Sequence, residues 1–93
     1  MRLCAIYNPL TESGNEQRIW FFPNGYGASV IRGPYTYGGP AGLFELAVLR
    51  GTQGDSALCY DTPITNDVLG HQTEAEIETL LVQIEALPKA KGV

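Results

Sequence analysis

The chain has 93 residues, a formal net charge of -4, and 44% hydrophobic against 17% charged residues. This length supplies one hydrophobic core and excludes a second domain, and the composition excludes an intrinsically disordered chain. Eleven glycines and six prolines favour short strands joined by turns over long helices.

The first 17 residues are expected to form an N-terminal segment outside the main fold. Leu3–Tyr7 has the apolar character of a short strand, and the polar, turn-rich stretch 8–17 predicts a mobile loop. No apolar run here or later in the sequence has the length of a membrane span or a signal-peptide core. We therefore predict a cytoplasmic protein with no membrane partner.

Two β-hairpins are predicted in the following part of the chain. In the first, Arg18–Phe22 and Tyr26–Arg32 flank Asn24-Gly25, a pair that supplies the positive φ of a tight turn. In the second, Leu43–Arg50 and Ala57–Thr62 flank a glycine-rich turn. Leu43–Arg50 carries apolar side chains at both odd and even positions, which is typical of a central strand buried on both faces.

The clearest local signal is a helix near the C-terminus. Thr73 and Glu76 have the spacing of a capping box. Apolar residues recur after it at helical spacing: Ile77, Leu80, Leu81, Ile84 and Leu87. This pattern predicts a helix over Glu74–Leu87, ended by Pro88, with a single helical turn before it in Ile64–His71.

These elements predict an α+β fold. An antiparallel sheet of four strands, or five if Leu3–Tyr7 pairs, is expected to carry the C-terminal amphipathic helix on one face. Residues 18–88 make up this single domain, between the N-terminal segment 1–17 and a tail at 89–93.

The sequence carries no recognisable catalytic, cofactor or metal-binding motif. No lysine precedes Lys89, which excludes a P-loop, and Ser29 lacks the flanking residues of a nucleophile elbow. His71, Cys4 and Cys59 are too few to complete a structural zinc site, and we expect the cysteines to be free thiols. We therefore predict a protein that is not an enzyme and that binds no cofactor or metal.

The charges are unevenly placed along the chain. Between Gly51 and Pro88 there is no lysine or arginine but there are seven carboxylates. Such an acidic side disfavours direct nucleic-acid binding, yet it can meet a basic, nucleic-acid-binding patch on another protein. The acidic residues expected at an interface are Asp61, Asp67, Glu74, Glu78 and Glu85.

Aromatic residues at turns extend the expected interaction surface. Tyr26, Tyr35 and Tyr37 fall at or beside glycine-rich turns, where large amphipathic rings often anchor interfaces. The alternative is that these rings close the end of the core, with their hydroxyls in solvent. Arg32 and Arg50 end neighbouring predicted strands, so we expect them to flank the same patch.

Four stretches resemble small proteins of unknown function encoded by tailed bacteriophages: FPNGYGASV, YGGPAGLFELAVL, CYDTPITNDVLG and TEAEIE. The resemblance covers roughly residues 19–88 and carries no catalytic motif. It implies an accessory protein of the host bacterial cytoplasm that binds and inhibits a host defence protein, such as CRISPR-Cas or another antiphage system. Two alternatives stay open: a homo-oligomeric structural protein, for example a homodimer, and a sponge for small molecules or nucleotides.

Overall fold

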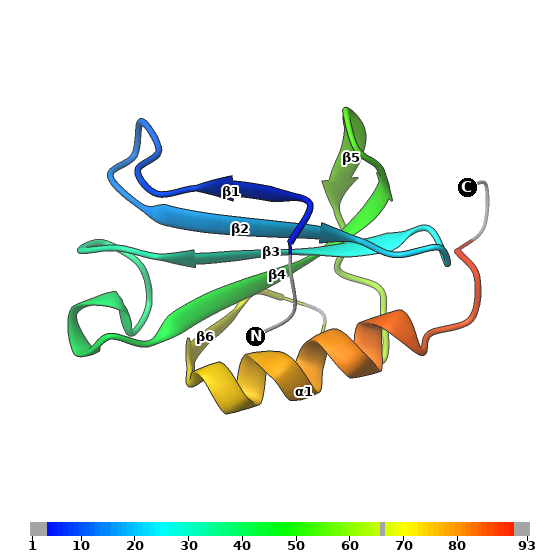
Figure 1. Ribbon diagram of the computed structural model, residues 1–93. Helices are drawn as coiled ribbons and strands as arrows, with labels where there is room; N and C mark the ends of the chain where they lie inside the picture. Colours follow the sequence, from blue (N-terminus) through cyan, green and yellow to red (C-terminus); the bar gives the residue numbers. More distant parts are fainter. Residues whose placement is uncertain (1–3, 66, 91–93) are drawn as a thin grey trace.

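The computed structural model of the protein describes residues 4–65 and 67–90. Across these ranges it has the predicted α+β architecture, an antiparallel sheet with a C-terminal helix on one face (Figure 1). The strands are β1 (Ile6–Asn8), β2 (Glu16–Phe21), β3 (Tyr26–Arg32), β4 (Phe44–Thr52), β5 (Asp55–Leu58) and β6 (Leu69–Gln72). Helix α1 spans Glu74–Glu85, and a short 3-10 helix spans Gly39–Ala41.

The strands β1 to β5 follow one another across the sheet in chain order, each antiparallel to the next. β6 breaks this order because it pairs with β4. Two short strands thus share the edge of β4 that faces away from β3. β6 pairs with its first half, where Phe44 lies opposite Gln72, and β5 pairs with its end, where Leu49 lies opposite Leu58.

The hydrophobic core fills the space between α1 and one face of the central strands. The strand register places Trp20 beside Ala28 and Ala28 beside Val48, so these three side chains share that face. The helix adds three side chains with no exposed surface: Ile77, Leu81 and Ile84. The predicted amphipathic packing of α1 is therefore confirmed.

The predicted capping box starts the helix. The Thr73 hydroxyl accepts a hydrogen bond of 3.2 Å from the Glu76 N–H, and the Glu76 carboxylate accepts one of 2.9 Å from the Thr73 N–H. The helix ends at Glu85, two residues before the predicted end. Leu87 precedes a proline, whose ring disfavours the helical conformation at that position.

The strand β6 lies where part of a helical turn was predicted, within Ile64–His71. That prediction is wrong, because Leu69–Gln72 pairs with β4 and His71 has a φ of 57°. Gly70 does not end a helix but allows close packing: an added Cβ would lie 2.5 Å from the Cβ of Tyr37. The sheet of the described residues consequently has six strands instead of four or five.

The remaining predicted strands are shifted by a few residues. β1 lies at Ile6–Asn8 instead of Leu3–Tyr7, and β2 begins at Glu16, so the N-terminal loop is confined to residues 9–15. Leu3 itself lies outside the described residues. β5 begins earlier than predicted, because Gln53 and Gly54 alone form the turn between the paired residues Thr52 and Asp55.

Candidate functional site

The most exposed aromatic rings lie in the loop 33–43, between β3 and β4. Tyr35 is 92% exposed and Tyr37 is 68% exposed. We call this segment the tyrosine loop. Its position agrees with the prediction that these two residues lie at a glycine-rich turn on the surface.

The backbone of the tyrosine loop is fixed by its own hydrogen bonds. Thr36 is buried, and its hydroxyl accepts from the Gly33 N–H and donates to the Gly33 carbonyl, both at 3.0 Å. Gly38 and Gly42 flank the 3-10 helix with φ values of 83° and 80°, a conformation that glycine adopts without steric cost. The loop therefore presents its rings from a preorganised backbone.

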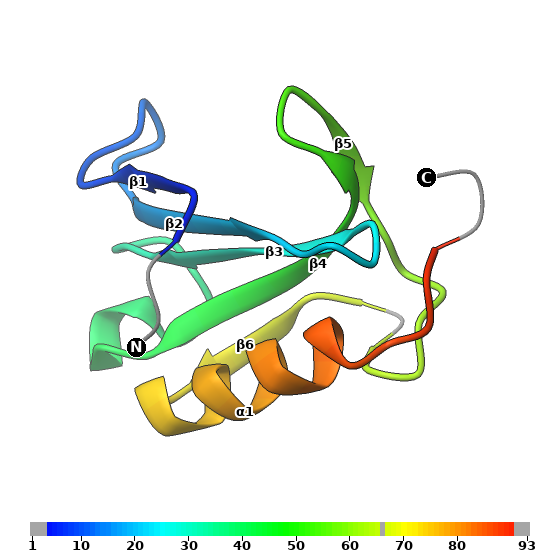
Figure 2. The same ribbon diagram turned by 45° about the vertical axis from the view of Figure 1, so that its right-hand side comes forward.

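The tyrosine loop also packs against β6. The N–H of His71 donates to the carbonyl of Tyr37 at 3.2 Å, and the Gly70 backbone lies against the Tyr37 side chain. Because α1 follows β6 directly, the loop and the first turn of the helix lie at the same end of the molecule (Figures 1 and 2). We call this end, with exposed Tyr35, Tyr37, His71 and Glu74, the tyrosine end.

The structure places the third predicted tyrosine and the arginines elsewhere. Tyr26 opens β3, and thus the full strand separates it from Tyr35. Arg32 pairs with Glu16 at 3.2 Å, and its guanidinium lies 4.5 Å from the centre of the Phe44 ring. Arg50 lies opposite Tyr26. The expectation that Arg32 and Arg50 flank one patch is wrong, because antiparallel pairing puts them at opposite ends of the sheet.

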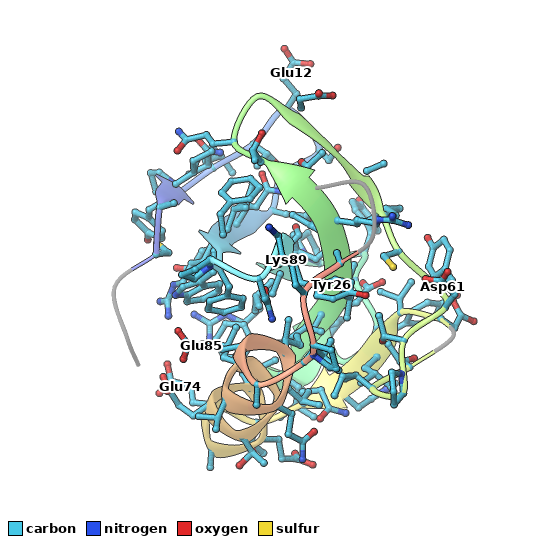
Figure 3. The ribbon with its side chains drawn as sticks, turned by 90° about the vertical axis from the view of Figure 1, so that its right-hand side faces the viewer. Glu12, Tyr26, Asp61, Glu74, Glu85 and Lys89 are labelled. Atoms are coloured by element: carbon cyan, nitrogen blue, oxygen red, sulfur yellow. The ribbon has the colours of Figure 1, made fainter. Side chains whose placement is uncertain are left out.

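The predicted acidic residues do not form one surface either. Figure 3 shows Glu74 and Glu85 on one side of α1 and Asp61 on the other side of the molecule. Glu74 and Glu85 are exposed, whereas Glu78 is half-buried. Asp67 is exposed, and its carboxylate accepts a hydrogen bond of 2.7 Å from the Val68 N–H.

A cavity of about 380 Å³ opens at the end of the sheet opposite the tyrosine end. Its lining includes the cross-strand pair Tyr26 and Arg50, together with Asp61, Pro63 and residues 87–89. We call it the end cavity. Sequence reasoning singled out Tyr26 and Asp61 but missed the cavity, because its walls come from four separate segments of the chain.

Asn24 holds one wall of the end cavity in place. Its side-chain nitrogen donates to three carbonyls at the exit of α1, those of Ile84 at 2.9 Å and of Glu85 and Leu87 at 3.1 Å. The Asn24 carbonyl accepts from the Ala90 N–H at 2.8 Å, and Ala90 is buried. The described part of the expected tail is therefore packed against the β2–β3 turn.

Cys59 is buried next to the end cavity. Its thiol lies 2.9 Å from the Asp61 carboxylate and donates a hydrogen bond to it. Burial and this hydrogen bond raise the pKa of the Cys59 thiol, although the charge of Arg50 opposes the effect. The thiol is therefore held in its neutral form and fixes the position of the Asp61 side chain.

The face of the sheet away from α1 carries apolar side chains. The register puts Ile6 opposite Ile19, and it places Phe21 and Leu49 on the two sides of Gly27. The β1–β2 loop and the β4–β5 hairpin rise on this side (Figure 2). We call the side chains on this face the outer sheet face: Ile6, Ile19, Phe21 and Leu49.

The described residues were also searched for a metal-binding cluster and for a membrane-spanning helix. No group of three or more histidine, cysteine, aspartate or glutamate side chains is placed to hold a metal ion in residues 4–65 and 67–90. Within the same ranges, no helix combines the length and the apolar character needed to cross a bilayer.

The chain was compared with protein-family models, with curated proteins and with solved structures, and none of the three comparisons found a match. The resemblance to bacteriophage accessory proteins therefore stays a prediction.

Proposed function

We propose that this chain is a non-enzymatic binding protein that docks on another protein through its tyrosine end. The observation that carries this proposal is the pair of largely exposed rings, Tyr35 and Tyr37, on a hydrogen-bonded loop. Tyrosine is enriched among the residues that dominate binding energy at interfaces, because its ring buries a large area with few rotatable bonds.

The energetics of this surface suit a small binding protein. Each tyrosine ring buries roughly 150 Å² or more in an interface, worth up to about 4 kcal/mol before the costs of association are subtracted. A fixed backbone reduces one of these costs, because the loop loses little conformational freedom when it binds. Two such rings are enough to form an energetic centre for an interface.

The charge beside the rings supports a partner with a basic surface. Glu74 is exposed at the start of α1, and the chain carries a net charge of -4. A basic patch on the partner would complement this charge and speed association. The resemblance to bacteriophage proteins suggests a host defence protein, such as a CRISPR-Cas component with a basic nucleic-acid-binding surface, as the partner class.

The proposal is tested by recovering a partner from host bacterial lysate, purifying it and measuring its affinity for variants of the chain. We expect the double variant Tyr35→Ala, Tyr37→Ala to bind about thirtyfold more weakly or worse, the effect of losing an interface hot spot. Tyr60→Ala is the matched control, since Tyr60 is 45% exposed but lies after β5, outside the tyrosine end. Equal affinities of the double variant and the wild type would refute the proposal.

Two charge-reversal variants show which end of α1 contributes its negative charge to partner binding. Glu74 and Glu85 lie on the same side of α1 but at its opposite ends (Figure 3). Glu74→Lys should slow association with the partner at low salt more than Glu85→Lys does. The opposite order would place the acidic contact at the other end of the helix.

The outer sheet face favours a second candidate function, that of a homo-oligomeric accessory protein. Ile6, Ile19 and Phe21 are partly exposed on this face beside the buried Leu49, and pairing of two such faces would bury them fully. Light scattering would then show a defined oligomer at low micromolar protein concentration. Phe21→Lys should convert this oligomer to a monomer, whereas Tyr35→Ala should leave it intact.

A further inference from the structure

We infer that the end cavity is a binding site for a small organic anion that carries a flat ring, the chemical class to which nucleoside monophosphates belong. The site lies at the opposite end of β3 from the tyrosine loop. It therefore does not depend on the protein-binding function proposed for the tyrosine end.

The strongest support comes from the distribution of cations. Arg18 and Arg32 both pair with Glu16, at 3.6 and 3.2 Å. Within residues 4–65 and 67–90, Arg50 and Lys89 make no ion pair with a carboxylate, and both line the end cavity. Among the described residues of this acidic protein, the two cations without an ion pair thus both line the end cavity. This arrangement favours an anionic group, such as a phosphate, between them.

The rest of the lining suits a ring. Tyr26, Pro63 and Pro88 contribute three ring side chains to the lining of the same cavity. Such side chains pack against aromatic or heterocyclic rings. The volume of about 380 Å³ also lies within the range of roughly 300–1,000 Å³ that is usual for small-molecule sites.

Asp61 adds a hydrogen-bond acceptor to the site. One of its carboxylate oxygens accepts a hydrogen bond from the Cys59 thiol at 2.9 Å, which fixes the side chain. The other oxygen can accept a hydrogen bond from a hydroxyl or amino group of the ligand. A sugar hydroxyl or a ring amino group satisfies this requirement, whereas inorganic phosphate has no ring to pack against Tyr26, Pro63 and Pro88.

The site is formed before a ligand arrives. Tyr26 and Arg50 are fixed side by side by the pairing of β3 and β4, and Asn24 ties residues 84–90 to the turn before Tyr26. Tyr26 also donates its backbone N–H to the Asn24 side chain at 3.0 Å. Binding therefore needs little rearrangement of the walls, which lowers its cost.

The test is titration calorimetry with three probes, adenosine 5′-monophosphate, adenosine and inorganic phosphate. We expect the monophosphate to bind more tightly than either fragment, because only it engages the cations and the ring surfaces together. In NMR spectra, its shift changes should be centred on Tyr26, Arg50, Asp61 and residues 87–89. The variants Arg50→Gln and Lys89→Gln should each weaken its binding by about tenfold or more.

Arg32→Gln is the matched control, since it removes a cation that is paired with Glu16 at the far end of β3. It should bind the monophosphate like the wild type, and so should the double variant Tyr35→Ala, Tyr37→Ala. Lys89 is exposed, so Lys89→Gln keeps the test valid even if Arg50→Gln fails to fold. The inference is overturned if the monophosphate does not bind, if phosphate alone binds as tightly, or if Lys89→Gln leaves its affinity unchanged.

Discussion

Asn24 caps helix α1 from the β2–β3 turn, with its side-chain nitrogen 2.9 Å from the carbonyl oxygen of Ile84, which lies 60 residues away in the sequence. The last turn of the helix has no basic residue, and its C-cap, Ala86, is right-handed. Pro88 keeps the helix from continuing, and tertiary structure supplies the cap, because the amide of Asn24 satisfies carbonyls that the helix leaves without partners. The same contact shapes the end cavity.

Loss of the Asn24 amide should destabilise the fold. We expect Asn24→Ala to lower the free energy of unfolding by roughly 1–3 kcal/mol in urea denaturation, since several carbonyls lose their donor. Asn24→Asp should cost at least as much, because it places a negative charge at the negative end of the helix dipole. Asn8→Ala is a suitable control, because within residues 4–65 and 67–90 the Asn8 side chain makes one long hydrogen bond, of 3.4 Å to Gln17. Wild-type stability of Asn24→Asp would contradict this account.

The capping box should contribute measurably to stability. Thr73→Ala removes the acceptor for the Glu76 N–H and is expected to cost about 1 kcal/mol, whereas Thr73→Ser should retain most of the wild-type stability. Thr79→Ala provides a threonine control inside the same helix, where alanine has the higher helix propensity. Thermal unfolding that ranks Thr79→Ala below Thr73→Ala would show that the cap is unimportant.

His71 adopts a backbone conformation that β-branched residues avoid. Its φ is 57°, and histidine tolerates this region better than valine does. We expect His71→Gly to keep stability within about 1 kcal/mol of the wild type, because glycine relieves the steric cost but loses more entropy on folding. His71→Val should be the less stable of the two in urea denaturation. Equal stability of the two variants would mean that the strand relaxes at this position.

The buried thiol of Cys59 should make stability depend on pH in the alkaline range. Because burial and the Asp61 hydrogen bond raise its pKa in the folded state, its contribution is complete below the unfolded pKa of about 8.5 and is lost as pH rises through the folded value. The free energy of unfolding should therefore fall above about pH 8.5. Cys59→Ser should show a flatter profile, and identical slopes in the two proteins would contradict the assignment.

The parts of the fold that follow from local patterns were predictable. The capping box at Thr73 and Glu76, and the Asn24-Gly25 turn, each depend on neighbouring residues alone. β6 was not predictable in this way. Its short sequence LGHQ contains a glycine and a histidine whose backbone is in the left-handed region, and its pairing with β4 is irregular. Its strand conformation depends on long-range pairing with β4, which the local sequence does not reveal.

The same division holds for the candidate sites: features set by local sequence were predictable, and features set by long-range contacts were not. Exposure of Tyr35 and Tyr37 follows from the glycine-rich loop that carries them, and their position beside His71 follows from β6, which the sequence does not reveal. The end cavity joins Tyr26 and Arg50, which depend on strand register, to Lys89, which depends on the Asn24 contact. Residues brought together by such long-range contacts leave no signal in spacing or composition.

Hydrogen–deuterium exchange of the complex between this chain and its purified partner tests the central claim most directly. We predict slower exchange on binding in the tyrosine loop 33–43, in β6 and in the first turn of α1, with little change around the end cavity. Protection confined to β1, β2 and β5, with unchanged exchange in the tyrosine loop, would contradict docking through the tyrosine end.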